Sequence, residues 1–180
     1  MWRVAWSALG WALRCYGRNL PLVLGLSAIP AAQRILITAP GDRLTGAAGG
    51  VSEVIVLAAR LLLVALLLRI AVRETIDQPT DRARLAWKAF TDGIDPRLAE
   101  FLLQFLPLLA AFAIFEVVPD ALIAATVAEP ERAWAVAILL AGKNVTVIAL
   151  TMTWLVGVGR AYMVLGTQTQ HPPRQQAVAS

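Results

Sequence analysis

Long apolar runs alternate with short amphipathic stretches along this chain. The long runs cover about residues 20–38, 51–72, 98–118 and 131–166. The first run has 19 residues, which at ~1.5 Å of rise per residue just crosses a hydrocarbon layer of ~30 Å. The pattern therefore predicts four transmembrane helices.

Prolines and cations interrupt these runs. Pro30 and Pro107 lie inside the first and third runs and predict kinks, because proline removes a backbone hydrogen bond. The last run has 36 residues, so we expect it to tilt or to project from the membrane. Lys143 and Arg160 bracket its most apolar part and are expected at its two lipid boundaries. Residues 119–142 also have room for an extra short helix, a choice that the pattern leaves open.

The first amphipathic stretch, residues 2–18, has helical spacing. One face carries apolar and aromatic side chains, namely Trp2, Trp6, Leu9, Leu13 and Tyr16. Another face carries Arg3, Ser7, Gly10, Arg14 and Arg18. Tryptophan opposite arginine is typical of a helix that lies in the membrane interface. The alternative is an amphipathic helix that packs on a soluble core.

A second short helix is predicted after the second span. Residues 79–81 (Pro-Thr-Asp) form a helix-start signal in which Thr80 or Asp81 is the cap. An apolar stripe follows at Ala83, Trp87, Phe90 and Ile94, and Arg84 and Lys88 lie off it. We expect this helix to lie in the interface as well and to end near Gly93.

Composition agrees with a membrane protein. Hydrophobic residues make up 58% of the chain and charged residues 16%, whereas soluble domains average roughly 45–50% and about 25%. The predicted fold is all-α, an integral membrane bundle of four transmembrane helices plus two interfacial amphipathic helices. Residues 1–166 would form one transmembrane domain, and residues 167–180 a disordered cytoplasmic tail.

Single copies of cysteine and histidine exclude several kinds of chemistry. Cys15 has no partner for an intrachain disulfide, and no Cys/His cluster exists for zinc or an iron–sulfur group. His171 lies in a tail rich in Pro and Gln, a poor place for a general base. We therefore expect no metal and no cofactor.

Arginine and lysine are distributed unevenly between the expected loops. With the N-terminus inside, eleven of them lie on the cytoplasmic side and only Arg34, Arg43 and Arg132 lie outside. The positive-inside rule then places both termini in the cytoplasm. The expected location is the cell inner (plasma) membrane, as a multi-pass protein. The net charge of +4 is interpreted as membrane topology and not as nucleic-acid binding. The basic cytoplasmic face, especially Arg82, Arg84 and Lys88, is expected to contact anionic membrane lipids.

The two halves of the chain share one plan. Residues 1–78 and 79–166 each contain a short amphipathic helix, a proline-containing span, an outer loop and a returning span with a cation inside it. A parallel repeat of this kind places a ligand site between the halves. The alternative is that any even number of spans divides into similar hairpins.

Arg60 is the main candidate for a functional site. A central arginine costs at least ~2.5–3.5 kcal/mol on insertion scales, so it should face protein or water. Glu53, on the same helix face, and Glu116, on the third span, are its expected partners. One interpretation is a site for an anionic substrate or lipid headgroup. The favoured interpretation is an ion pair that fixes helix packing.

Other residues within the spans are weaker candidates. Lys143 is expected to be an outer-interface anchor or part of the charge site with Arg60. Gln104, close to Pro107, can hydrogen-bond across helices or line a cavity. Two strips of small residues, which let helix backbones approach closely within or between chains, are Gly25, Ala28 and Ala32, and Gly157, Gly159 and Ala161.

Residues 7–38 (SALGWALRCYGRNLPLVLGLSAIPAAQRILIT) resemble small uncharacterised actinobacterial polytopic membrane proteins. In that pattern an amphipathic segment ending in arginine leads directly into a proline-containing span. The resemblance implies a bacterial membrane protein of unknown role, and it transfers no functional residue.

The sequence contains no GxSxG, P-loop, HExxH or metal-carboxylate motif. The leading hypothesis is a non-enzymatic membrane protein that acts by association, as a homo-oligomer or as an accessory subunit of a membrane complex. The alternative is a small transporter or lipid-binding protein with an anionic-ligand site near Arg60.

Overall fold

A computed structural model describes residues 2–38, 46–78 and 80–170, which are mostly helical and contain no strand. The helices are α1 (Trp2–Arg18), α2 (Leu20–Thr38), α3 (Gly46–Thr75), α4 (Arg82–Ile94), α5 (Leu98–Leu103), α6 (Phe105–Thr126), α7 (Glu129–Lys143) and α8 (Ala149–Gln170). A 3₁₀ turn, η1 (Asp95–Arg97), follows α4, and a π-helical turn, η2 (Asn144–Ile148), joins α7 to α8.

Four helical stretches of the described residues are long and apolar enough to cross a membrane. They are Leu20–Thr38, Gly46–Thr75, Arg82–Thr126 and Glu131–Thr169. The all-α class and the four predicted spans are therefore confirmed by length and composition. The chain is built as a multi-pass helical membrane protein.

The ends of several helices differ from the predictions. Helix α6 continues through Pro119 to Thr126, so the apolar residues after Pro119 end this span and do not form a separate short helix. Helix α8 continues past Gly166 to Gln170, so the first residues of the predicted tail are helical. The rest of that tail, residues 171–180, lies outside the described residues.

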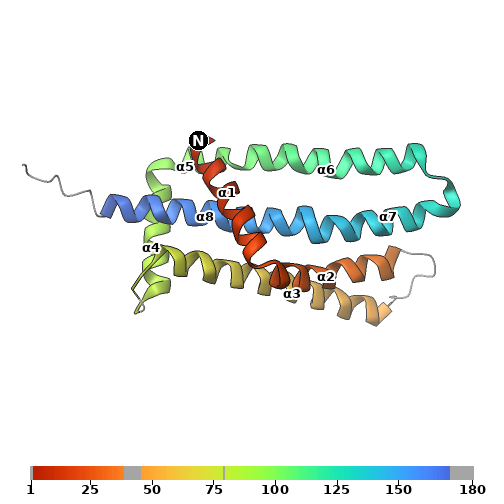
Figure 1. Cartoon of the computed structure of the whole chain (residues 1–180), viewed down its shortest axis with the longest axis horizontal. Coiled ribbons are helices and arrows are strands. Elements are labelled where there is room, and N and C mark those ends of the chain that lie inside the picture. Colours follow the sequence, from red (N-terminus) through yellow and green to blue (C-terminus); the bar gives the residue numbers. More distant parts are fainter. Residues whose placement is uncertain (1, 39–45, 79, 171–180) are drawn as a thin grey trace, which may run out of the picture.

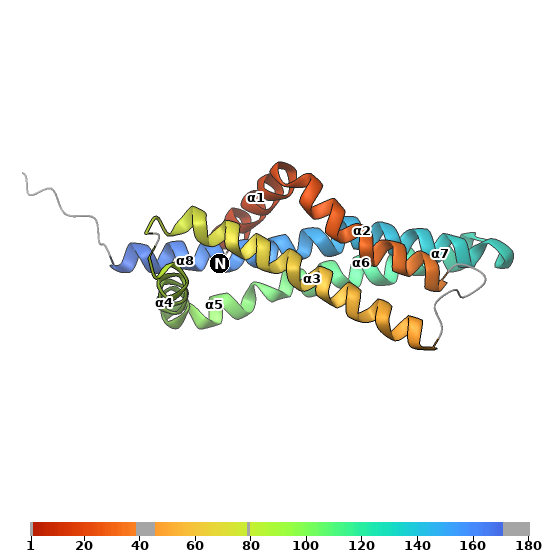
Figure 2. The same ribbon diagram turned by 90° about the horizontal axis from the view of Figure 1, so that it is seen from below.

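The long helices lie side by side in an open arrangement (Figure 1). Helices α7 and α8 run through the middle, α6 runs along one edge, and α2 and α3 run along the other. Helix α4 crosses one end of the molecule almost at right angles to α8, and α1 crosses over α8. Figure 2 shows that α1 and α2 meet at an angle and stand on one face of this arrangement.

Close backbone contacts fix the two short helices against α8. A Cβ atom on Gly93 of α4 would lie 2.1 Å from the carbonyl oxygen of Tyr162, and one on Gly166 would lie 1.8 Å from that of Ala89. On α1, the carbonyl oxygen of Ala8 lies 2.9 Å from the Cβ position of Gly157. Only glycine fits at these crossings, as in the small-residue interfaces of membrane helices.

A face of α1 that the sequence analysis did not single out packs against the rest of the chain. Ala8, Trp11, Ala12 and Cys15 are buried against the rest of the chain, whereas Trp6 remains 66% exposed. The buried side chains are mostly small, so a search for large apolar residues missed them. Helix α1 thus keeps Trp6 and Leu13 exposed in addition to its packed face.

Prolines account for two interruptions of the helices. Pro21 has no N–H to donate to the carbonyl of Gly17. Asn19 lies between α1 and α2, where the two helices meet at a bend (Figure 2). Its side chain donates to the Cys15 carbonyl at 2.9 Å. Pro107 likewise cannot bond to the carbonyl of Leu103, and α5 ends at that residue. The predicted kink at Pro107 is therefore a break just before it. Pro30 is accommodated within α2.

The start of α4 was predicted less accurately. The helix begins at Arg82, directly after Asp81, as the pattern indicated. Asp81, however, makes no side-chain capping bond and adopts a left-handed backbone conformation with φ of 58°. The main-chain carbonyl of Asp81 accepts from the Leu85 N–H at 2.9 Å instead.

The order of elements in the two halves follows the shared plan, but their packing differs. Both short helices, α1 and α4, pack on α8 of the second half. A symmetric pair of repeats would place one of them on α3. Duplication thus stays a prediction.

Candidate functional site

The π-helical turn η2 lies where the charged residues of the spans come together. Arg60 of α3 donates from Nη2 to the side-chain oxygen of Asn144 at 2.9 Å. Asn144 in turn donates from Nδ2 to the Leu140 carbonyl at 2.8 Å. One amide therefore connects a cation of α3 to the backbone of α7, and η2 begins at that amide.

The wider spacing of a π turn changes which backbone carbonyls are available for other partners. Tyr16 of α1 donates its hydroxyl hydrogen to the carbonyl of Val145 at 2.7 Å. This bond ties α1 to η2. The turn is thus held by side chains from two other helices.

A cavity of about 10 Å³ lies beside Arg60 and Asn144 and is also lined by Ser27 and Pro30. Pro30 leaves the Leu26 carbonyl without its helical partner, and Leu26 lines the same cavity. A space of ~10–15 Å³ holds about one water molecule. It is too small for an anionic substrate or a lipid headgroup.

Lys143 lies next to Asn144 and makes a separate set of contacts. Its side chain is 8% exposed, and Nζ lies 3.3 Å from Glu116 and 3.4 Å from Asp120 of α6. Both carboxylates are half exposed, at 47% and 52%. These ion pairs are the main polar link between α6 and the rest of the molecule.

The charged residues thus pair differently from the sequence prediction. Arg60 pairs with the neutral Asn144, and no ion pair joins it to Glu53 or Glu116 in the described residues. Glu116 pairs with Lys143 instead, and Glu53 is exposed on α3. The sequence analysis selected Arg60 and Lys143 but not Asn144. Helix register across a tertiary contact is not visible in hydropathy.

Gln104 is buried at the break between α5 and α6, with 1% of its surface exposed. Its Nε2 donates to the Glu100 carbonyl at 3.4 Å. It does not line the cavity beside Arg60. Gln104 therefore belongs to the helix break that Pro107 imposes and not to the Arg60 site.

A second polar cluster, at the α4 end of the molecule, was missed by the sequence analysis. Trp11 of α1 donates its indole N–H to Glu74 of α3 at 2.7 Å. Arg160 of α8 lies 3.4 Å from the same carboxylate oxygen and stacks over the Trp11 ring at 5.7 Å. Three helices meet at this cluster. Trp11 lies three residues after Ala8 and four before Cys15, so the three share one helix face. This spacing was the sequence signal that could have indicated that Trp11 packs inside the protein.

Cys15 lies near this cluster. Burial raises the pKa of the Cys15 thiol, and the negative charge of Glu74 raises it further. The hydrogen bond from Asn19 and the charge of Arg18 act in the opposite direction and are smaller effects. The thiol is therefore protonated and unreactive near neutral pH.

Most residues assigned to the interface by sequence are accessible. Trp87 is 68% exposed, and the basic residues of this group, Arg14, Arg18, Arg84 and Lys88, are exposed as well. The side chain of Trp2 lies outside the described residues. An exposed tryptophan beside exposed cations is compatible with an interfacial position, which stays a prediction.

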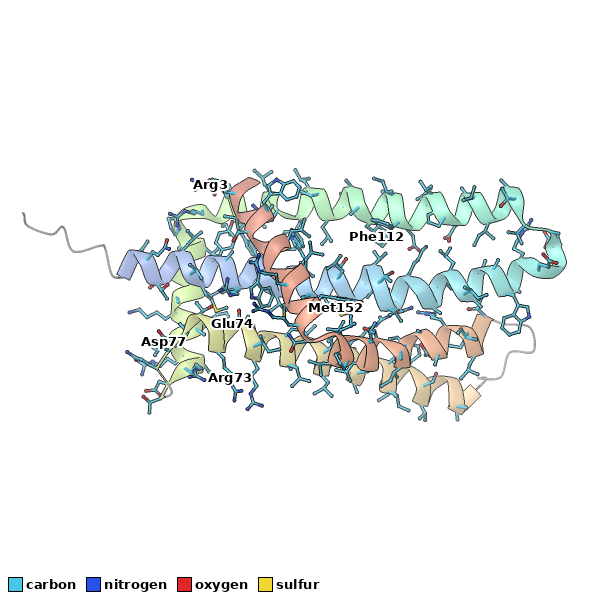
Figure 3. All side chains as sticks on the ribbon, viewed as in Figure 1. Arg3, Arg73, Glu74, Asp77, Phe112 and Met152 are labelled. Atoms are coloured by element: carbon cyan, nitrogen blue, oxygen red, sulfur yellow. The ribbon has the colours of Figure 1, made fainter. Side chains whose placement is uncertain are left out.

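Three open cavities border α8. One of about 390 Å³ lies between α1, α6 and α8, and one of about 640 Å³ lies between α6 and α8. Phe112 and Met152 line the second, and Figure 3 shows Phe112 on α6 and Met152 on α8. The third, of about 870 Å³, lies between α3, α4 and α8. Their linings are mainly apolar, which suits acyl chains or helices.

No protein family, curated protein or solved structure matches this chain. Its four long apolar helices define the class as multi-pass helical membrane proteins. Within the described residues no group of three or more His, Cys, Asp and Glu side chains could hold a metal ion. The polar sites found here join helices to one another.

Proposed function

We propose that this chain is a non-enzymatic integral membrane protein that acts by association, as a homo-oligomer or as an accessory subunit of a membrane complex. The observation that carries the proposal is the exposure of α6. This span has no buried residue along its whole length. It contacts the rest of the chain mainly through the ion pairs of Lys143 and through α7.

The polar residues of α6 support a protein neighbour. Glu116 and Asp120 are half exposed on a helix whose other large side chains are apolar and exposed. Carboxylates that face lipid are costly and generally face protein or water. A helix laid against α6 would cover these groups, and Glu116 also lines the cavity of about 640 Å³ between α6 and α8.

The orientation belongs to the same proposal. Both termini lie in the cytoplasm, with α1 and α4 in the cytoplasmic interface of the plasma membrane. The basic residues near α4 and the exposed Trp87 support this arrangement. The cavity beside Arg60 has room for about one water, so it does not support the alternative function in which Arg60 binds an anion.

Photo-crosslinking in intact membranes tests the proposal. A photoreactive amino acid at Ile114 of α6, which is 58% exposed, is compared with one at Leu61 of α3, which is 61% exposed. We expect a protein adduct from Ile114 and mainly lipid adducts from Leu61. A crosslinked product of twice the chain mass indicates a homo-oligomer. A single product that joins the chain to one other protein indicates an accessory subunit. Only lipid adducts at both positions, with a monomer on gentle extraction, would contradict the proposal.

A further inference from the structure

The cavity between α3, α4 and α8 differs from the other two because its lining contains cations without a carboxylate. Its lining includes Arg69 and Arg73 of α3 and Arg82 of α4. The remaining lining side chains are apolar and come from all three helices, with Val64 and Leu68 on α3, Trp87 and Phe90 on α4, and Met152 and Met163 on α8. The cavity is thus an apolar groove with cations.

The three arginines lie toward one end of the groove. Arg69 and Arg73 are in the last third of α3, and Arg82 begins α4, which crosses that end of the molecule (Figure 1). Figure 3 shows Arg73 at this end. The opposite end is lined by Val64 and Met152 and carries no charge. Charge and apolar surface are therefore separated along the groove.

None of these arginines has a carboxylate partner within ion-pair distance in the described residues. Arg82 donates to the Gln78 carbonyl at 3.3 Å, and this bond leaves most of its donors free. Glu74, which is close in sequence to Arg73, is engaged by Trp11 and Arg160. Within the part of the chain that the structure describes, no carboxylate forms an ion pair with the arginines at this end of the groove.

We propose that this groove binds an anionic phospholipid, with the phosphate at Arg69, Arg73 and Arg82 and an acyl chain along the apolar walls of α3 and α8. The guanidinium groups suit phosphate oxygens, and the volume of about 870 Å³ suits a chain of lipid size. The tight contact of Gly93 with α8 fixes α4, so this end of the groove is preformed.

This inference does not depend on oligomerisation. It rests only on the membrane location and on the interfacial position of α4 proposed above. The occupant is a lipid and not free phosphate, because the cations line the same cavity as exposed apolar residues such as Leu68 and Leu155. A free anion would leave that apolar surface uncovered.

Native mass spectrometry of the purified full chain tests the inference. Phosphatidylglycerol and phosphatidylcholine are added at equal concentrations, and retained lipid is counted per protein mass. The test variant is Arg73→Gln/Arg82→Gln. The matched control is Arg84→Gln/Lys88→Gln, which removes the same number of charges from exposed positions of α4 that do not line the groove.

We expect the wild type and the control to retain phosphatidylglycerol in preference to phosphatidylcholine. The test variant should bind phosphatidylglycerol roughly 10- to 30-fold more weakly, the loss expected for two cations near the phosphate. Equal losses in both variants, or no loss in either, would overturn the inference, because charge attraction would then be nonspecific or absent.

A second variant tests the apolar part of the groove. Leu68 is 46% exposed and lines the cavity, so Leu68→Trp fills the space without disturbing the buried core. We expect it to weaken phosphatidylglycerol binding several-fold with all arginines present. Unchanged binding, or competition by inorganic phosphate alone at equal concentration, would show a bare anion site and overturn the lipid assignment. The number of chains per complex, read in the same spectra, reports separately on association.

Discussion

Arg60 in α3 and Asn144 at the start of η2 are joined by a hydrogen bond of 2.9 Å between Nη2 and the amide oxygen. An arginine inside a span usually needs a partner or water, and here the partner is a neutral amide that also holds the Leu140 carbonyl. The pair therefore fixes α3 against α7 without burying a carboxylate.

A double-mutant cycle should detect this pair. We expect Asn144→Leu to destabilise the protein by about 1–2 kcal/mol, because the Arg60 guanidinium loses its acceptor in a site with room for only about one water. Thermal unfolding of wild type, Asn144→Leu, Arg60→Leu and the double variant gives the coupling. Strictly additive losses would show that the two side chains do not interact.

The α4–α8 crossing should be intolerant of any side chain at its glycines. Gly93→Ala places a methyl group 2.1 Å from the Tyr162 carbonyl oxygen, and we expect losses of about 1–3 kcal/mol or more from such overpacking. Unfolding of the purified protein in detergent measures the loss.

The control for this crossing is Gly142 on α7. Gly142 is exposed and has no atom within 4 Å of its Cβ position. Gly142→Ala should leave stability unchanged or raise it by up to about 1 kcal/mol, since alanine favours helix. Similar behaviour of Gly93→Ala and Gly142→Ala would mean that α4 does not pack on α8 as described.

The contrast between these two glycines shows what the sequence could predict. Apolar run length predicted all four spans, because hydrocarbon thickness fixes the length of a spanning helix. The same patterns predicted α1 and α4 as helices, with ends close to those observed. The glycine of α4 was used only to end a helix, although it is the point of closest contact with α8.

The polar contacts were predicted less well. Arg60, Lys143 and Glu116 were selected as unusual charges, because a charge inside an apolar run is visible in one dimension. Their pairing was wrong, since it depends on how α3 and α6 are rotated against α7. The π turn that begins at Asn144 shifts that rotation, and no residue pattern indicated it.

The thiol of Cys15 should react slowly with iodoacetamide in the folded protein. The side chain is buried, and its pKa is raised above the ordinary value of 9.0, so the thiolate that reacts is scarce at neutral pH. We expect the alkylation rate to rise with pH through and beyond 9.

Displacement of α1 gives the corresponding positive control. Gly157→Leu should separate α1 from α8, because the Ala8 carbonyl oxygen already lies 2.9 Å from the Cβ position of Gly157. We expect alkylation of Cys15 to become several-fold faster in this variant at fixed pH. A fast reaction in the wild type, equal to that of the unfolded chain, would contradict the buried position of Cys15.

The ion pairs of Lys143 should control how α6 is attached. Lys143→Met removes the shared partner of Glu116 and Asp120, and we expect faster hydrogen exchange in α6 with little change in α3. Because α6 has no buried residue, the change should be concentrated in α6. Lys143→Arg keeps the charge and is expected to preserve the protection, so equal exchange in both variants would show that the ion pairs do not hold α6.

The proposed orientation makes opposite predictions for the two ends of the molecule. Ala128, between α6 and α7, and Thr80, between α3 and α4, are both exposed and lie near opposite ends of the long helices. Each is changed to cysteine in a Cys15→Ala background, and intact cells are treated with a membrane-impermeant maleimide. With both termini inside, we expect Ala128→Cys to be labelled and Thr80→Cys to be protected until the cells are opened. The reverse pattern would invert the topology and place the arginines of the α3–α4–α8 groove at the outer leaflet, where the positive-inside rule does not put them.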